Sequence, residues 1–263
     1  MASPAPPLDL RPFGARSIVL SVLLGSHPPE MPVAPLLGFT ALFGISDGTV
    51  RTALSRMSAR GELESNDGVY RLSGRLLDRQ SQQDAGRANP PANWDGQWWT
   101  AFVLSDSRTL AERRIFRSRA QGARLGELRP DTWLRPANLD VPTDLPDVAL
   151  TLGRFVTGDD EELVRKLWDL DALDQQAREL LGRVDQTHKL LDLDEPSDSA
   201  LTSAFTVLAT CLRYLRIEPQ LPVELADSTA SNDLRARYGH VEHLFQEQLA
   251  RFFQRRGVSR AAL

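Results

Sequence analysis

The segment over 46–72 constrains the fold most, because its hydrophobic pattern changes period at Gly61. Before this glycine the apolar residues recur with helical spacing, and Ser46 is a good N-cap for a helix that runs to about residue 60. After it, two short strand-like runs flank the turn sequence Ser65-Asn66-Asp67-Gly68. The segment is therefore expected to fold as a helix followed directly by a β-hairpin.

Two further helices are expected before this segment. The sequence ARSIVLSVLLG has helical apolar spacing and ends at Gly25, and a second short helix is predicted over 33–43 with Gly44 as its stop. HPPEMP, between them, is interpreted as a breaker segment. Three helices and then a hairpin is the order of a winged helix-turn-helix, and a fourth helix is expected over 73–85.

The rest of the chain predicts an α+β multidomain protein. Strands are expected over 98–104 and 148–156, a strand pair or an extended segment over 125–134, and helices over 107–121 and 159–166, which suggests a small α/β domain. The pattern is helical over 168–192, 199–216 and 232–256. The predicted domains are a disordered tail 1–12, a DNA-binding domain 13–85, a polar linker 86–93, an α/β domain 94–166 and a helical domain 167–263.

The third helix has the character of a DNA-reading helix. Its apolar residues fall on one face, and the opposite face is small, hydroxylated and basic, with no acid after Asp47. Small residues let a helix enter the major groove, where Arg binds guanine and hydroxyls reach bases or phosphates. A solvated amphipathic helix could share this pattern. The candidate DNA contacts are Ser46, Thr49, Arg51, Thr52, Ser55 and Arg56, together with Arg71 of the hairpin.

Composition is compatible with a DNA-binding protein in the cytoplasm. The net charge is −4, but residues 140–198 hold 16 of the 35 acidic side chains. The remaining segments, 1–93, 94–139 and 199–263, are each net positive. Negative charge is thus concentrated where it can face away from DNA. A single cysteine, Cys211, excludes an internal disulfide, and no apolar run is long enough to span a bilayer. The N-terminal segment lacks the features of a signal peptide.

Three other clusters carry candidate chemistry. Arg113, Arg114 and Arg117 are interpreted either as a phosphate clamp for DNA or an effector, or as a solvated face. His240, His243 and Glu247 have a spacing that could bind a metal, although surface polar residues explain it better; His188 is expected to be an ordinary solvent-facing residue. The tryptophans at 94, 98 and 99 are expected to pack in a core rather than stack on an aryl effector. No Ser-His-Asp arrangement, GxSxG or phosphate-binding Gly-rich loop is present, so we expect neither an enzyme nor a cofactor.

The chain resembles the PaaX-type repressors of phenylacetate catabolism. The resemblance is carried, in order, by ARSIVLSVLLG, ALFGISDGTVRTALSRMSARGELE, WDGQWWTAFVLSD, RIFRSRAQGARLGELRPDTWLRP and LRYLRIEPQLPVEL. It implies a winged helix, a central ferredoxin-like domain similar to Cas2 and a C-terminal helical domain. It also implies a homodimer that represses a catabolic operon and leaves the operator when it binds an acyl-CoA effector such as phenylacetyl-CoA.

Two other functions stay open from the sequence. Asp106 follows the strand expected over 98–104, where a Cas2-like metal-dependent nuclease would place a metal-binding carboxylate. The winged helix could also serve as a protein-interaction module that binds a partner protein in place of DNA.

Overall fold

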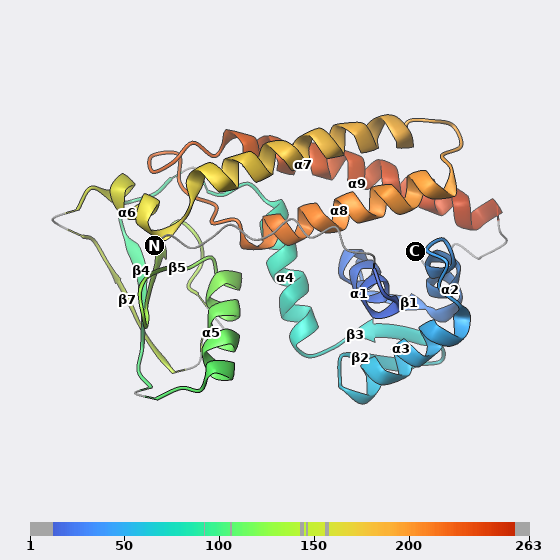
Figure 1. Ribbon diagram of the computed structural model, residues 1–263, viewed down its shortest axis with the longest axis horizontal. Coiled ribbons are helices and arrows are strands. Elements are labelled where there is room, and N and C mark those ends of the chain that lie inside the picture. Colours follow the sequence, from blue (N-terminus) through green and yellow to red (C-terminus); the bar gives the residue numbers. More distant parts are fainter. Residues whose placement is uncertain are drawn as a thin grey trace. The chain divides into compact units, whose positions relative to one another are not determined.

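The computed structural model describes residues 13–91, 93–105, 107–142, 145, 147–155 and 158–255, and these form a mixed α+β fold (Figure 1). The predicted tail, 1–12, lies outside the described residues. The helices are α1 (Ala15–Gly25), α2 (Val33–Ala41), α3 (Asp47–Ala59), α4 (Arg75–Arg87), α5 (Leu110–Gly122), α6 (Asp160–Leu167), α7 (Leu170–Leu191), α8 (Asp198–Ile217) and α9 (Thr229–Arg255). The strands are β1 (Glu30–Pro32), β2 (Leu63–Asn66), β3 (Val69–Leu72), β4 (Trp98–Val103), β5 (Gly126–Arg129), β6 (Thr132–Pro136) and β7 (Val148–Gly153).

The chain divides into two compact units. The four-stranded unit contains Ala85–Leu181 and Leu212–Ala236, and the three-stranded unit contains Gly182–Cys211 with the described residues of Asp9–Asp84 and Arg237–Leu263. The predicted domains follow one another along the chain, whereas α7, α8 and α9 each contribute residues to both units. The helical C-terminal part therefore belongs to both units.

The three-stranded unit contains the expected three helices and hairpin. β3 lies between β1 and β2, and both pairings are antiparallel. The segment HPPEMP does separate α1 from α2, as a breaker should, but its last three residues, Glu30–Pro32, pair with β3 as an edge strand that we did not expect. An edge strand tolerates proline at its end, because one of its sides needs no ladder hydrogen bonds. The core of this unit is formed by apolar residues of α1, α2 and α3 together with β1, β2 and β3.

Helix α2 is apolar on almost all of its sides, which requires cover on more than one face. The ring of Phe39 meets the ring of Phe205, of α8, at 4.9 Å between centroids, and that of Phe245, of α9, at 6.5 Å. The Cβ of any side chain at Gly38 would lie 3.3 Å from the ring of Phe253. Parts of α8 and α9 therefore complete the core of the three-stranded unit.

The four-stranded unit is built on an antiparallel sheet of order β5-β6-β4-β7. Helix α5 packs on one face, where the rings of Phe116 and Trp133 meet at 5.9 Å. A Cβ at Gly126 would lie 2.7 Å from the Cβ of Leu167, so the end of α6 approaches the sheet closely. The element order is β-α-β-β-β-α, in which α6 follows the fourth strand, whereas a ferredoxin-like domain has its second helix before that strand.

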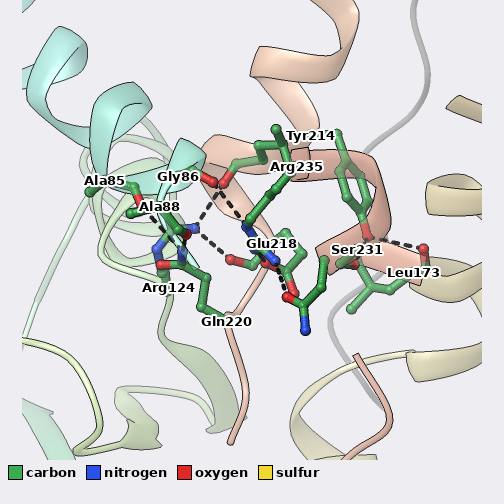
Figure 2. Close-up of polar contacts among 12 residues, drawn as sticks. Ala85, Gly86, Ala88, Arg124, Leu173, Tyr214, Glu218, Gln220, Ser231 and Arg235 are labelled. Atoms are coloured by element: carbon green, nitrogen blue, oxygen red, sulfur yellow. Dashed lines mark hydrogen bonds and ion pairs between the residues drawn. The ribbon is translucent and has the colours of Figure 1, made fainter. Parts of the chain in front are cut away.

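A buried polar network joins distant segments within the four-stranded unit (Figure 2). Arg235 of α9 forms an ion pair with Glu218 and donates from Nε to the carbonyl of Gly86 at 3.0 Å. The side-chain amide of Gln220 donates to the carbonyls of Ala85 and Ala88 at 3.1 and 2.8 Å. The last turn of α4 is therefore held by residues from the C-terminal part of the chain.

Arg124 and Tyr214 extend this network. Arg124 donates to the carbonyls of Leu215 and Glu218, and its burial lowers the pKa of the guanidinium to about 10, so the group stays charged at neutral pH. The hydroxyl of Tyr214 donates to the carbonyl of Leu173 at 3.1 Å and lies 2.9 Å from the hydroxyl of Ser231, and burial raises the pKa of this tyrosine.

Among the helices that the structure describes, none is long and apolar enough to cross a membrane.

Candidate nucleic-acid interface

Helix α3 begins where the sequence predicts. Ser46 has an extended backbone, and its Oγ accepts from the backbone N–H of Thr49 at 3.4 Å and lies 2.9 Å from the Thr49 hydroxyl. Asp47 stands in the first turn, where the helix dipole favours a negative charge. Two of the predicted DNA contacts, Ser46 and Thr49, thus also fix the N-terminus of the helix.

The cap gives a first testable prediction. Replacing Ser46 with alanine is expected to lower the free energy of unfolding of the three-stranded unit by about 1 kcal/mol, because an amide of the first turn loses its acceptor. Ser46→Asp retains an acceptor and should recover most of this loss. Urea denaturation of the three proteins checks the prediction, and equal stability of Ser46→Ala and wild type would contradict it.

The two faces of α3 differ as expected. Val50, Leu54 and Met57 are buried in the core, and Ala53 packs partly against it. The opposite face is open to solvent over its whole length; its exposed residues are Gly48, Arg51, Thr52, Ser55, Arg56 and Ala59. The hydroxyl of Thr52 donates to the carbonyl of Gly48 at 2.8 Å, which leaves its oxygen free to accept a further hydrogen bond. The outward face is therefore accessible to a ligand.

The arginines of this face have no competing partner among the residues that the structure describes. No hydrogen bond or ion pair joins the side chains of Arg51, Arg56 or Arg60 to any other residue within the described part of the chain. Sequence reasoning missed Arg60 and also Arg75, which is exposed in the first turn of α4. The hydroxyl of Ser73 donates to the carbonyl of Gly61 at 2.9 Å and brings the start of α4 to the end of α3. Together the four arginines form an exposed positive surface.

The hairpin contributes less positive charge than expected. Its turn has positive φ at Asp67 and Gly68, as a two-residue hairpin turn requires, and Val33 donates to the Gly68 carbonyl at 2.9 Å. Arg71 donates from Nε to the carboxylate of Glu30 at 2.6 Å, across the β1–β3 pairing. Since Glu30 lies in the strand that we did not expect, this ion pair was not predictable. With Arg71 neutralised, the hairpin is a weaker candidate for phosphate contact than α3.

The second arginine cluster is on α5. Arg113 and Arg114 are exposed and have no ion-pair partner among the described residues, whereas Arg117 pairs with Glu127 at 2.7 Å. Thr109 and Glu112 form a capping box at the start of this helix, and their hydrogen bonds lower the pKa of Glu112. Two of the three predicted effector-binding arginines are thus open to an anionic ligand.

The tryptophans divide between a core and a shallow hollow. Trp98 is buried, and its Nε1 donates to Asp160 at 3.2 Å, while its ring meets that of Trp94 edge-on at 5.8 Å. Trp94 and Trp99 line a hollow of about 410 Å³, whose other lining residues are both apolar and polar, the polar ones being Asn93, Asp95, Gln97 and Asp140. The predicted packing in a core is confirmed for Trp98, whereas the rings of Trp94 and Trp99 are partly exposed to solvent.

The three residues of α9 whose spacing could bind a metal do not come together around one point in the described structure. His243 lies 3.4 Å from Glu247, but His240 turns to His188 of α7, with 3.2 Å between their Nε2 atoms. No group of three or more potential metal ligands occurs in the part of the chain that the structure describes. Asp106, the carboxylate of the nuclease alternative, lies outside the described residues.

By its fold the chain is a mixed α+β protein of two compact units, and one of them presents an exposed basic helix. The family model of PaaX-like proteins matches residues 14–76. Among solved structures, the uncharacterized protein Rv0674 from Mycobacterium tuberculosis is similar, with 33% sequence identity, a TM-score of 0.65, and coverage of 92% of this chain and 98% of that chain. None of the curated proteins matches.

The chain belongs to the PaaX-like family, which comprises regulators of phenylacetic acid catabolism. The family model covers the residues that form α1 to β3 and the start of α4. It therefore includes the whole exposed surface around α3.

Proposed function

We propose that this protein is a DNA-binding transcriptional repressor of a catabolic operon, and that an acyl-CoA effector such as phenylacetyl-CoA releases it from the operator. The observation that carries this proposal is the exposed outward face of α3, on which Arg51, Thr52 and Ser55 are accessible to a ligand. Membership of the PaaX-like family supports the same function. The proposal assigns the protein no catalytic activity.

In this proposal residues 13–85 form a winged helix, and α3 is the helix that enters the major groove. The element order α1-β1-α2-α3-β2-β3 supports the assignment. The four-stranded sheet with α5 corresponds to a Cas2-like domain in which the second helix, α6, follows the fourth strand, β7, in the sequence instead of preceding it. The protein acts in the cytoplasm as a homodimer, so that two copies of α3 reach two half-sites on one face of the duplex.

The side chains of α3 suit complementary tasks on DNA. Arg51 stands on the outward face between small residues, where a guanidinium can bind the O6 and N7 atoms of guanine. The hydroxyls of Thr52 and Ser55 accept or donate to bases and phosphates. Arg56 and Arg60, near the end of the helix, carry charge that suits the phosphate backbone. Arg113 and Arg114 of α5 are assigned to the phosphates of the effector.

The test is a DNA-binding measurement on the full chain. Fluorescence anisotropy with a duplex from the upstream region of its own operon should show sequence-selective, salt-dependent binding. Arg51→Ala is expected to weaken selective binding by about 1–3 kcal/mol, roughly 5- to 150-fold, and to leave binding to a random duplex much less affected. Arg251→Ala is the matched control, because Arg251 is an exposed arginine of α9 outside this surface.

Two outcomes would contradict the proposal. The first is an absence of selective binding to any duplex from the flanking genes, which would favour a protein-interaction module. The second is cleavage of the duplex in the presence of Mg²⁺, which would favour the nuclease alternative. Release of the duplex by phenylacetyl-CoA, weakened by Arg113→Ala combined with Arg114→Ala, tests the effector assignment separately.

A further inference from the structure

Two histidines from different helices meet in the three-stranded unit. The Nε2 atoms of His188, on α7, and His240, on α9, lie 3.2 Å apart, although 52 residues separate them in the sequence. Their ring centroids are 5.1 Å apart and their planes are inclined by 30°. Both rings reach solvent, so an ion from solution can approach them.

The distance between the two nitrogens suits a shared metal ion. Zinc binds imidazole nitrogen at about 2.0–2.1 Å, and a tetrahedral angle between two such bonds places the nitrogens about 3.3 Å apart. On the same ion the ring centroids stand about 5.2 Å apart, because each ring points along its own metal bond. Two rings joined end to end by a straight hydrogen bond would have centroids farther apart, at about 5.5 Å. The observed 3.2 and 5.1 Å fit two rings that converge on one point.

The scaffold holds the two rings in this position. Three residues before each histidine, Asp185 of α7 and Arg237 of α9 form an ion pair at 2.9 Å. Beyond the pair, the side-chain amide of Gln248 donates to the carbonyl of Leu191 at 3.0 Å. These contacts on both sides of the histidines fix the register of α7 and α9. The two helices therefore need little further ordering when an ion binds.

We propose that His188 and His240 form a two-histidine binding site for a divalent transition-metal ion such as Zn²⁺. The ion replaces the hydrogen bond between the rings, and both imidazoles bind it through Nε2 while each carries its proton on Nδ1. The other coordination positions are left to water or to an exchangeable ligand, because within the described residues no third ligand joins the pair. The ion cross-links α7 to α9 and stabilises the unit by mass action.

The four histidines of the chain make the assignment testable one residue at a time. Titration calorimetry of Zn²⁺ into the chelator-treated full chain, without a polyhistidine tag, is expected to show a single equivalent bound at neutral pH. His188→Gln and His240→Gln should each weaken binding by more than about tenfold, since even the loss of an outer-shell partner costs about 10- to 100-fold in metal affinity. Both sites are exposed enough for glutamine, and circular dichroism checks the fold of each variant.

Two matched controls complete the design. His243→Gln removes the exposed histidine of the α9 cluster, and His27→Gln removes the histidine that pairs with Asp84 at 3.1 Å. Both should bind Zn²⁺ as wild type does, and a Zn²⁺-dependent rise in Tm should disappear only in the His188 and His240 variants. Absence of binding to wild type, or loss of binding in either control without loss in the pair variants, would overturn the proposal.

Discussion

Replacing Arg235 with alanine is expected to lower the free energy of unfolding of the four-stranded unit by about 3–5 kcal/mol. The side chains of Arg235 and Glu218 form an ion pair and are only 1% and 4% exposed. Alanine would leave the carboxylate of Glu218 buried without its cation and would also remove a donor from the Gly86 carbonyl. A buried charge that loses its partner costs far more than the pair itself contributes.

Chemical denaturation monitored by tryptophan fluorescence measures this loss, since all five tryptophans lie in the four-stranded unit. Arg178→Ala is the control, because it removes an ion pair within the same unit whose members, Arg178 and Asp174, are 67% and 41% exposed. Solvent screens such a pair, so its loss should cost less than about 1 kcal/mol. Replacing Arg235 and Glu218 together by methionine should recover much of the loss. Equal costs for the two single variants would refute the argument.

The second large effect is expected at Leu54. This residue of α3 is fully buried in the core of the three-stranded unit, and its replacement by alanine should cost about 2–5 kcal/mol from lost burial and the resulting cavity. Because the whole exposed surface of α3 depends on this core, DNA binding by Leu54→Ala should fall with rising temperature well before that of wild type. Thermal denaturation and anisotropy on the same samples measure both effects.

The next residue along the helix provides the contrast. Ser55 is exposed, so Ser55→Ala should change stability by no more than about 0.5 kcal/mol. It should nevertheless weaken selective DNA binding at low temperature, where Leu54→Ala is still folded. If Ser55→Ala bound the duplex as wild type and Leu54→Ala lost binding while folded, the assignment of inward and outward faces would be wrong.

Local patterns predicted most of the secondary structure of this chain. Helical spacing and an N-cap placed the third helix at 46–60, and the structure has it at Asp47–Ala59; the turn at Asn66, Asp67 and Gly68 located the hairpin. These signals act over a few residues and are therefore visible in a sequence. β1 was missed because its proline is read locally as a breaker, whereas its stability depends on β3, about forty residues further along the chain.

Contacts between distant segments could not be predicted from local sequence patterns. The spacing of His240 and His243 on one helix suggested a cluster, but the partner of His240 came from α7. Likewise Arg124 and Arg235 gave no sign that they would be buried, because the carbonyl groups that Arg124 binds belong to residues more than ninety positions away. The pairing of Arg71 with Glu30 also depends on β1, a strand that local sequence patterns did not predict. Long-range pairing decides which charged groups remain available for binding.

The sharing of α7, α8 and α9 between the two units limits how this protein can be dissected. A fragment that stops after residue 84 would keep the exposed helix, but it would lose Phe205 and Phe245, which contact the ring of Phe39. That fragment would carry an uncovered aromatic surface and is expected to aggregate. A fragment for biochemical work on the proposed DNA-binding surface therefore has to retain the C-terminal helices.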